Sequence, residues 1–291
     1  MMRKYLIHYK LIFCLLFTVA AFKQVSAQKN YLLFPGAPGI VSYTYRDIFK
    51  VDMPGTLDMV KGNGITDIEF SNLFGKTAEE IRKLIDERGI HCSSYGVNYD
   101  DLVNKTDEVA QTAKILGAQF VRVAWIPHKG TFTPEDAQKT VADFNRCGKL
   151  LKEQYGLSFL YHNHGYEFEP AGDGTLYDYI VKNTDPAYVG LELDILWAFF
   201  PSQDPAKLLT QYGNRYKALH LKDLRKGVTG NMSGGTSSEN DVILGTGQIN
   251  IPEIIKAALK VGVLHFYLED ESSNSIKQVP ESIKYLNSLK R

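Results

Sequence analysis

The sequence contains little cysteine. Only three cysteines occur among its 291 residues, at positions 14, 92 and 147. Small domains that depend on disulfides for their stability are dense in cysteine, so this count excludes a disulfide framework. Cys92 and Cys147 could pair in an oxidising compartment, but we expect two buried thiols instead.

An excess of one charge is also missing. The chain carries 33 basic and 33 acidic residues. Proteins that bind nucleic acid usually present a strongly basic face, and this balance gives no sign of one. We therefore expect no nucleic-acid partner.

No apolar run reaches the ~20 residues that a membrane-spanning helix needs. The run near the start has about a dozen apolar residues, follows a basic start and ends in small residues at Ala27, which is typical of a secretory signal peptide. We expect residues 1–27 to be a signal peptide and 28–291 the mature protein. The protein would then be exported to a bacterial periplasm, without stable membrane insertion. A lipoprotein is disfavoured because Cys14 lies inside the apolar run.

The predicted mature chain has the size of a single barrel domain. Cleavage would remove four cations and no anion, which leaves 29 basic and 33 acidic residues. The roughly 264 remaining residues are near the usual length of a (β/α)8 barrel. We see no linker and expect one domain.

Two kinds of segment alternate along this domain. Runs rich in β-forming residues occur at 39–44, 65–70, 90–97, 119–125, 157–163, 189–194, 216–222 and 264–270. Amphipathic helical patterns occur at 54–62, 77–88, 105–116, 133–155, 175–183, 204–212, 251–262 and 279–290. Parallel strands need crossover helices, and eight such units close most naturally into a TIM barrel. A doubly wound open sheet is the alternative.

Local signals mark the helix boundaries. Thr77 and Thr133 stand where helix-capping residues are expected. Glycines at 62, 89, 117, 156 and 262 stand where helices commonly end in a left-handed residue. The segment 225–247 is rich in Gly, Ser and Asn, and it is long enough to be a lid or a binding loop.

Polar side chains gather at the ends of the last four predicted strands. They are His162, Asn163, His164 and Glu167 on the fifth, Glu192 and Asp194 on the sixth, His220, Lys222 and Asp223 on the seventh, and Glu269, Asp270 and Glu271 on the eighth. In a TIM barrel the carboxyl ends of the strands form the active site. Period-two alternation directs Glu192 and Asp194 to one side, and likewise His220 and Lys222.

Several carboxylates in a small space repel one another unless a cation lies among them. Mixed Asp, Glu and His donors suit Mn²⁺, Zn²⁺, Fe²⁺, Co²⁺ or Mg²⁺. Each residue alone could be an ordinary surface or capping side chain. Their recurrence on four adjacent strands predicts one divalent metal ion, whose identity the sequence leaves open.

The stretches "YHNHGYEFEP", "LHLKDL", "LGTGQINIPEIIKAAL" and "FYLEDE" resemble the sugar phosphate isomerase/epimerase members of the xylose isomerase-like barrel superfamily. The resemblance covers nearly all of the mature chain. Its relatives include tagatose and inosose epimerases, inosose dehydratases and deglycosylases that act on 3-keto-glycosides. It implies one divalent metal held by a side chain from each of strands five to eight.

The resemblance also implies particular ligands. Asp194, His220 and Glu269 match the ligand positions of the family. For the fifth strand we favour Glu167, a carboxylate that would swing in, with His162 or His164 as the alternative.

The chemistry implied is that of an enediolate. A metal that chelates a carbonyl and its neighbouring hydroxyl acidifies the α C–H bond and stabilises the enediolate. Proton transfer would give isomerisation or epimerisation of a keto-sugar, and a β-leaving group would give elimination instead. Glu269 is the usual base of the family, and His162, His164 and Lys222 are candidate acid–base or oxyanion partners.

Several residues could contact the sugar. Trp125 and Trp197 would offer stacking surfaces, although both could equally be core residues, and Asn163 would offer a polar contact. The pKa of Lys222 could be lowered toward neutrality near a metal, or Lys222 could simply pair with Asp223.

Two departures from the family bear on the substrate. Relatives commonly carry a histidine near the end of strand three, where this sequence has Gly96, and this predicts a wider or differently lined pocket. Export predicts a free or glycosidic sugar rather than a sugar phosphate.

Two rival functions share the fold. A non-catalytic carbohydrate-binding barrel would keep every motif. A DNA-repair nuclease of the endonuclease IV type needs further metal ligands from the earlier strands and a basic groove, which the sequence lacks. Relatives are often dimers or tetramers, so a homo-oligomer is a further expectation.

Overall fold

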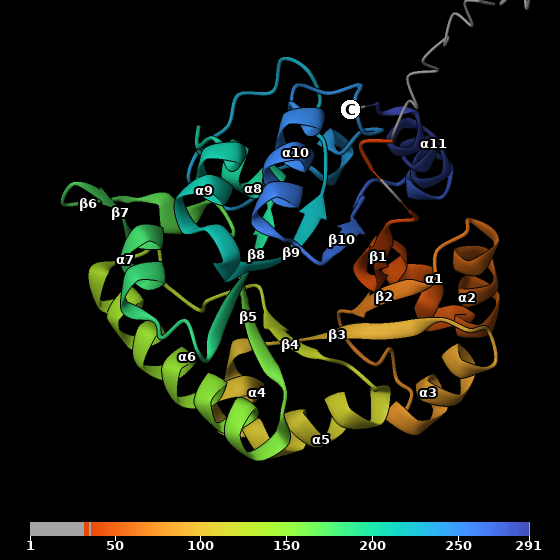
Figure 1. Ribbon diagram of the computed structural model, residues 1–291, viewed down its shortest axis with the longest axis horizontal. Coiled ribbons are helices and arrows are strands. Elements are labelled where there is room, and N and C mark those ends of the chain that lie inside the picture. Colours follow the sequence, from red (N-terminus) through yellow and green to blue (C-terminus); the bar gives the residue numbers. More distant parts are fainter. Residues whose placement is uncertain (1–31, 35, 291) are drawn as a thin grey trace, which may run out of the picture. The chain divides into compact units, whose positions relative to one another are not determined.

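Eight parallel strands close into a barrel (Figure 1). The computed structural model describes residues 32–34 and 36–290. The strands are β1 (Gly39–Val41), β2 (Asp67–Phe70), β3 (His91–Val97), β4 (Phe120–Val123), β5 (Ser158–His162), β8 (Val189–Asp194), β9 (Tyr216–Leu221) and β10 (His265–Leu268). Each predicted strand coincides with one of them, so the TIM barrel is confirmed and the open sheet is wrong. The predicted signal peptide lies outside the described residues.

Helices surround the strands, as expected for crossover connections (Figure 1). The eight predicted ones are α2 (Met53–Gly62), α3 (Ala78–Asp86), α5 (Thr106–Leu116), α6 (Pro134–Tyr155), α7 (Leu176–Asn183), α9 (Pro205–Tyr212), α10 (Ile251–Val261) and α11 (Ser275–Ser288). The sequence did not predict α1 (Arg46–Val51), α4 (Tyr99–Asn104), α8 (Ile195–Phe199) or the hairpin β6 (Pro170–Ala171) and β7 (Gly174–Thr175). These elements have two to six residues, too few for a clear helical or strand period.

The helix boundaries follow the local signals closely. Thr77 and Thr133 each form a reciprocal capping box at the start of α3 and α6. Gly117, Gly156 and Gly262 end α5, α6 and α10 with left-handed backbone. The prediction for Gly62 is wrong: it is the last residue of α2, and Gly64 adopts the positive φ of 79° two residues later. Gly89 has a positive φ but lies beyond the C-cap of α3.

An apolar layer inside the barrel positions the site above it. Val41, Phe120, Leu160, Ala218 and Tyr267 form this layer and are almost fully buried. Side chains two residues apart on a strand face the same side, so the next inward positions are Arg122, His162, His220 and Glu269. The barrel interior therefore changes from apolar to charged within one pleat.

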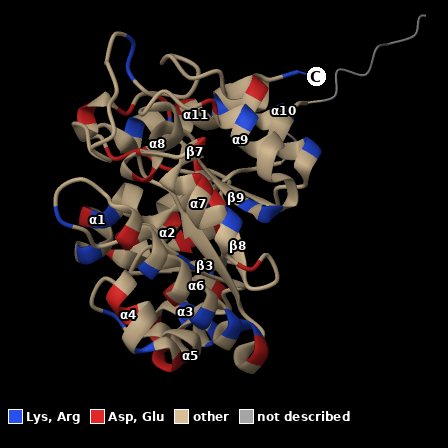
Figure 2. Ribbon diagram, turned by 90° about the vertical axis from the view of Figure 1, so that its left-hand side faces the viewer, with Lys and Arg blue, Asp and Glu red and all other residues tan. Residues whose placement is uncertain are grey.

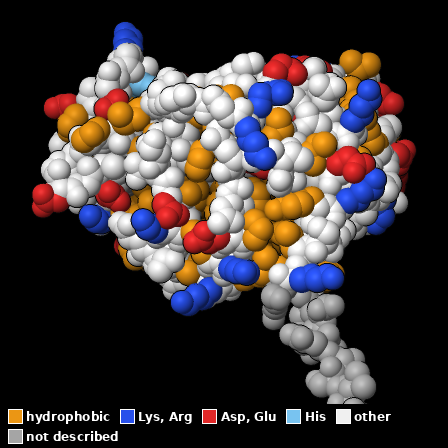
Figure 3. Space-filling view, turned by 90° about the horizontal axis from the view of Figure 1, so that it is seen from above, with side chains coloured by type: hydrophobic (Ala, Val, Ile, Leu, Met, Phe, Trp, Pro, Cys, Tyr) orange, Lys and Arg blue, Asp and Glu red, His pale blue; other side chains and the backbone are white. Residues whose placement is uncertain are grey.

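The cysteines and the distribution of charged side chains match what the sequence predicts. Cys92 and Cys147 are buried and unpaired. None of the helices in the described part of the chain is both long and apolar enough to cross a membrane. Cations and anions are interspersed along the outer helices in Figure 2 and are mixed around a central band of hydrophobic side chains in Figure 3.

Candidate metal centre

A cavity of about 520 Å³ opens at the carboxyl ends of the strands. Residues from β4, β5, β9 and the end of β10 line it, together with α8 and the loop after β9. Gly234, Gly235 and Thr236 are the lining residues of that loop, so the segment 225–247 reaches the cavity as a binding loop would. The barrel mouth is therefore a concave site of the size that small-molecule ligands occupy.

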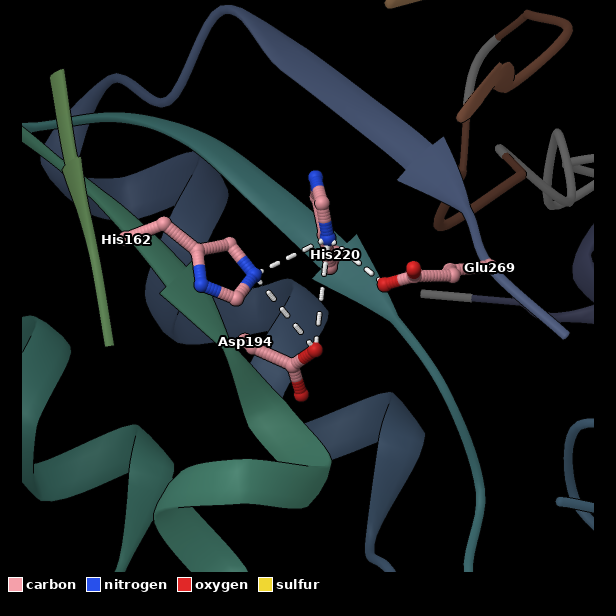
Figure 4. Close-up of side chains that lie close together, drawn as sticks. All are labelled: His162, Asp194, His220 and Glu269. Atoms are coloured by element: carbon pink, nitrogen blue, oxygen red, sulfur yellow. Dashed lines mark hydrogen bonds and ion pairs between the residues drawn. The ribbon is translucent and has the colours of Figure 1, made fainter. Parts of the chain in front are cut away.

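Four side chains, three of them buried and Glu269 partly exposed, converge at one side of this cavity (Figure 4). His220 Nδ1 lies 2.8 Å from Glu269 Oε2, 3.1 Å from His162 Nε2 and 3.9 Å from Asp194 Oδ2. His162 Nε2 lies 3.6 Å from the same Asp194 oxygen. The structure thus brings together the predicted ligands Asp194, His220 and Glu269, with His162 as the fifth-strand member.

Asp194 divides its two oxygens between different tasks. Oδ1 caps α8, accepting from the backbone N–H groups of Leu196 and Trp197 at 2.9 Å each. Oδ2 is buried and has no hydrogen-bond donor among the described residues. Burial raises the pKa of Asp194, and the Lys222 ammonium, whose Nζ lies 3.9 Å from Oδ2, opposes this shift. The free oxygen faces the other three donors (Figure 4).

These four residues fit a divalent cation. Oxygen and nitrogen donors that share one ion lie no more than about 4.4 Å apart, twice their longest usual distance to zinc. The four distances above satisfy this limit, and all four donor atoms lie within 4.8 Å of one another. Two imidazoles and two carboxylates form a donor set that suits Zn²⁺, Mn²⁺, Fe²⁺ or Co²⁺. A cation between them would give Asp194 Oδ2 a closer partner than Lys222 Nζ, which lies 3.9 Å away.

Two carboxylates, those of Glu69 and Glu192, contact the His220 ring nitrogen that points away from the other three donors. This nitrogen, Nε2, lies 3.0 Å from Glu69 Oε1 and 3.2 Å from Glu192 Oε2. Arg122 donates to Glu69 and also pairs with Glu192, whose Oε2 lies 3.3 Å from the Arg122 Nε. A hydrogen bond from Nε2 to a carboxylate leaves the Nδ1 lone pair free for a metal, an arrangement common among metal-bound histidines.

Burial and pairing compete at these groups. Burial alone would raise the pKa of Glu69, but Arg122 and His220 bring it well below its usual range. Burial would likewise lower the pKa of His220, yet Glu192, Glu269 and Glu69 raise it well above the ordinary value. Glu69 therefore stays ionised, and the carboxylates around His220 favour a positive charge at this position.

The structure pairs Lys222 with carboxylates other than Asp223, so the predicted pair with Asp223 is wrong. Its Nζ donates to Glu271 Oε1 at 2.6 Å and lies 3.5 Å from Glu269 Oε2. Burial favours the neutral amine, but the surrounding carboxylates raise the pKa of Lys222 well above its usual value. Asp223 is not its partner, because that carboxylate accepts backbone N–H groups of the loop at Gly245 and Gly247.

Glu167 and Asn163 lie outside the metal cluster. The Glu167 carboxylate accepts from the Tyr161 hydroxyl at 2.9 Å and from the backbone N–H of His164, and burial raises its pKa to about 7. Glu167 therefore holds the backbone at the end of β5, and the prediction that it is the fifth-strand ligand is replaced by His162, which lies in the cluster. Asn163 exchanges two hydrogen bonds with the backbone of Asp194, so its amide positions that ligand and is not directed at a substrate.

Aromatic rings form the wall beside the cluster. His164 stacks on Trp197 with ring centroids 5.6 Å apart, and it meets Trp125 edge-on at 5.3 Å. All three line the cavity. Trp197 is buried, whereas Trp125 is 46% exposed at the rim. A half-exposed tryptophan at a cavity mouth offers an apolar face to a ligand.

Sequence reasoning missed Glu69 and Arg122, since it searched only the ends of the last four strands. A usable signal was present, because each is a charged residue with apolar neighbours on both sides in its strand, and such residues are rarely buried without a partner. Gly96, which stands where relatives commonly carry a histidine, leaves room for the Arg122 side chain. A Cβ at this position would lie 2.8 Å from Arg122 Nη2, so the guanidinium fills the space that glycine leaves.

Comparisons with known proteins agree with this architecture. Residues 57–289 match the profile of the family described as xylose isomerase-like TIM barrel. The sugar phosphate isomerase/epimerase of Parabacteroides distasonis ATCC 8503 superposes with a TM-score of 0.70 at 27% identity, over 87% of this chain and 94% of that one. The IOLI protein with a binding zinc atom shares the fold alone, with a TM-score of 0.68 at 15% identity over 86% and 95% of the two chains.

Curated relatives match over a shorter stretch. The inosose dehydratase of Clostridium tetani is 35% identical over 101 residues, which are 34% of this chain and 33% of that protein. The match thus spans about a third of the relative's length.

Proposed function

Because this chain belongs to the xylose isomerase-like TIM barrel family, we propose that it is an enzyme that removes an α proton from a keto-sugar or an oxidised glycoside with the help of one divalent metal ion. The observation that carries this proposal is the buried Asp194 Oδ2, which accepts no hydrogen bond from the described residues and faces His162, His220 and Glu269. A buried carboxylate oxygen that accepts no hydrogen bond is unusual in a protein, and a cation held between the four donors would account for it.

The ion would be held by His162, Asp194, His220 and Glu269. When bound, it would supply a Lewis acid for adjacent carbonyl and hydroxyl oxygens of the sugar. The zinc in the IOLI protein agrees with this, but the likeness is one of fold, so the donor set is the main support.

The remaining steps belong to the chain's own residues. The Glu269 carboxylate is partly accessible, with a side chain 9% exposed, and it lines the cavity, so it can take the proton from the α carbon. Lys222 is 3.5 Å from that carboxylate and keeps it anionic beforehand. Burial would raise the pKa of Glu269, but Lys222 and His220 hold it well below its usual range.

His164 can order the sugar. Its Nδ1 is 3.0 Å from the Ala124 carbonyl oxygen and must donate there, so Nε2 carries a lone pair that can accept from a substrate hydroxyl. Burial, with the charge of His162, lowers the pKa of His164 to about 3, so the ring stays neutral near pH 7. Trp197 and Trp125 would stack against the apolar faces of the sugar.

Two outcomes follow from the same proton abstraction. Return of the proton gives isomerisation or epimerisation, which the Parabacteroides neighbour supports. Loss of a β-substituent gives elimination, which the inosose dehydratase relatives support. If residues 1–27 direct export, as we propose, a free or glycosidic sugar in the periplasm is the natural substrate.

The test is proton exchange. Metal-reconstituted protein is incubated in D₂O with a panel of free, phosphorylated and 3-oxidised sugars, and NMR follows both exchange and product. We expect solvent deuterium at the α carbon of at least one keto-sugar, and no exchange with Glu269→Gln. Binding of a sugar without exchange in the metal-loaded protein would instead indicate a non-catalytic carbohydrate-binding barrel.

A further inference from the structure

Arg122 is a buried cation that lines the cavity from β4, the strand next to the one that carries His162. It lies on β4, its side chain is 8% exposed, and it lines the same cavity as His162, His220 and Glu269. Its charge is balanced by Glu69 and Glu192. A guanidinium this deep in a cavity is held there by its surroundings and cannot be an ordinary surface cation.

The guanidinium uses only part of its donor capacity. Nε donates to Glu69 Oε1 at 2.9 Å, and Nη2 donates to the same oxygen. Nη1 makes no hydrogen bond to any described residue, and it is not among the fully buried atoms that lack a partner. Since a guanidinium carries five N–H donors in a fixed plane, the two on Nη1 are open to the cavity.

Gly96 makes this placement sterically possible. An ideal Cβ on Gly96 would lie 2.8 Å from Nη2, 2.9 Å from Cζ and 3.2 Å from Nη1 of Arg122. Any side chain at position 96 would therefore push the guanidinium aside. The carboxylates on one edge and the bare glycine backbone on one face fix its position together.

The chemistry of the open edge indicates its ligand. A guanidinium donates best to an oxygen that carries negative charge. When the α C–H bond of a keto-sugar breaks, its proton passes to the base and the electron pair moves onto the carbonyl oxygen. A donor fixed in advance near that oxygen lowers the barrier, because it gains strength only as the charge develops.

We propose that Arg122 is a further catalytic residue, whose Nη1 donates to the enediolate oxygen of the substrate, and that Gly96 is required to leave room for it. This rests on the proposed function, since it assumes a substrate held between the metal cluster and β4. It gives Arg122 a role separate from its support of Glu69.

The experiment separates these roles with an enediolate mimic. Manganese-loaded protein is titrated with glycolohydroxamate, and EPR of the bound Mn²⁺ follows both metal and mimic. Gly96→Ala shifts the guanidinium but keeps its charge, and Arg122→Lys keeps a cation without the planar edge. Gly62→Ala is the matched control, because no atom lies within 4 Å of a Cβ there.

We expect Gly96→Ala to bind Mn²⁺ as tightly as the wild type but glycolohydroxamate about tenfold more weakly, the value of one charged hydrogen bond. Arg122→Lys should weaken the mimic at least as much, and Gly62→Ala should change neither. Unchanged mimic binding in Gly96→Ala and Arg122→Lys would overturn the assignment. Parallel loss of Mn²⁺ and mimic in Gly96→Ala would also overturn it, in favour of a purely positioning role.

The proposed function fails in a different way. If the wild-type protein does not bind Mn²⁺ at all, the metal centre is refuted and the role of Arg122 with it. If the wild type binds Mn²⁺ and the mimic but the variants match it, only the role of Arg122 is refuted.

Discussion

The two halves of the barrel mouth balance their charges differently. The half formed by β5, β8, β9 and β10 collects His162, Asp194, His220 and Glu269, and Asp194 Oδ2 is buried there without a hydrogen-bond donor in the described part of the chain. In the half formed by β2, β3 and β4, Glu69 accepts from both Arg122 and the Ser94 hydroxyl at 2.6 Å.

The first half contains a buried carboxylate oxygen that accepts no hydrogen bond from the described residues, whereas the Glu69 carboxylate of the second half is hydrogen-bonded. A buried anion is tolerated when it is paired and is costly when it is not. The first half therefore offers Asp194 Oδ2 to a ligand from outside the chain, as the proposed function requires, whereas the charges of the second half are paired within the chain. His220 joins the halves, with Nδ1 facing the first and Nε2 facing the second.

The largest effect should be a loss of metal affinity when a carboxylate of the half with His162, Asp194, His220 and Glu269 is removed. Asp194→Asn keeps an oxygen to cap α8 but removes the anionic donor. Loss of a residue that only hydrogen-bonds to a metal ligand costs about 10–100-fold in metal affinity. Loss of a direct ligand should therefore lower the metal affinity by more than about a hundredfold. Elemental analysis after gel filtration should then find little bound metal.

The matched control for this change is Asp204→Asn, because Asp204 caps α9 in the same way, accepting from Ala206 and Lys207 at 3.0 and 3.1 Å. It should retain the metal. Equal metal content in Asp194→Asn and the wild type would contradict the assignment of the site.

The next effect should be a loss of stability when the ion pair between Arg122 and Glu69 is removed. Arg122→Gln leaves Glu69 buried without its main partner, and such a loss typically costs about 3–5 kcal/mol in the free energy of unfolding. Urea denaturation of the metal-free protein measures this directly. The comparison is Arg82→Gln, which breaks an exposed pair with Asp86 and should cost less than about 1 kcal/mol. Similar values for the two variants would show that the second half is not held by its ion pairs.

The smallest effect concerns His164, whose ring lies at the edge of the first half. Its pKa is lowered from 6.5 to about 3 by burial and His162, so below pH 6.5 the unfolded chain takes up a proton that the folded one refuses. Stability contributed by this residue is thus lost as the pH falls, by about 1.4 kcal/mol per pH unit. Between pH 6.5 and 5 the metal-free wild type should lose about 2 kcal/mol more than His164→Phe. Parallel pH profiles of unfolding would contradict this.

The two halves also differed in how far the sequence could predict them. Asp194, His220 and Glu269 stand at strand ends, where the barrel fold places functional side chains, and their types alone suggested a metal. Arg122 and Glu69 lie on β4 and β2 with β3 between them. Their pairing depends on Gly96 having no side chain, which no pattern along the chain expresses.

The fifth strand shows the same limit on a smaller scale. Glu167 and His162 were both candidates, and their spacing does not distinguish them. The Tyr161 hydroxyl and the His164 backbone N–H hold the Glu167 carboxylate, so the imidazole of His162 faces the cluster instead. Lys222 likewise found Glu271, a residue 49 positions away, in preference to its neighbour Asp223.

The sequence by itself determined the order of strands and helices, the helix caps and the side of each strand that faces inward, because these follow from periodicity and local backbone preferences. Only the tertiary structure decided which charges meet. Closing the barrel brings side chains from distant strands within hydrogen-bonding distance, and the partner that each one finds depends on side-chain reach and on the space left by its neighbours.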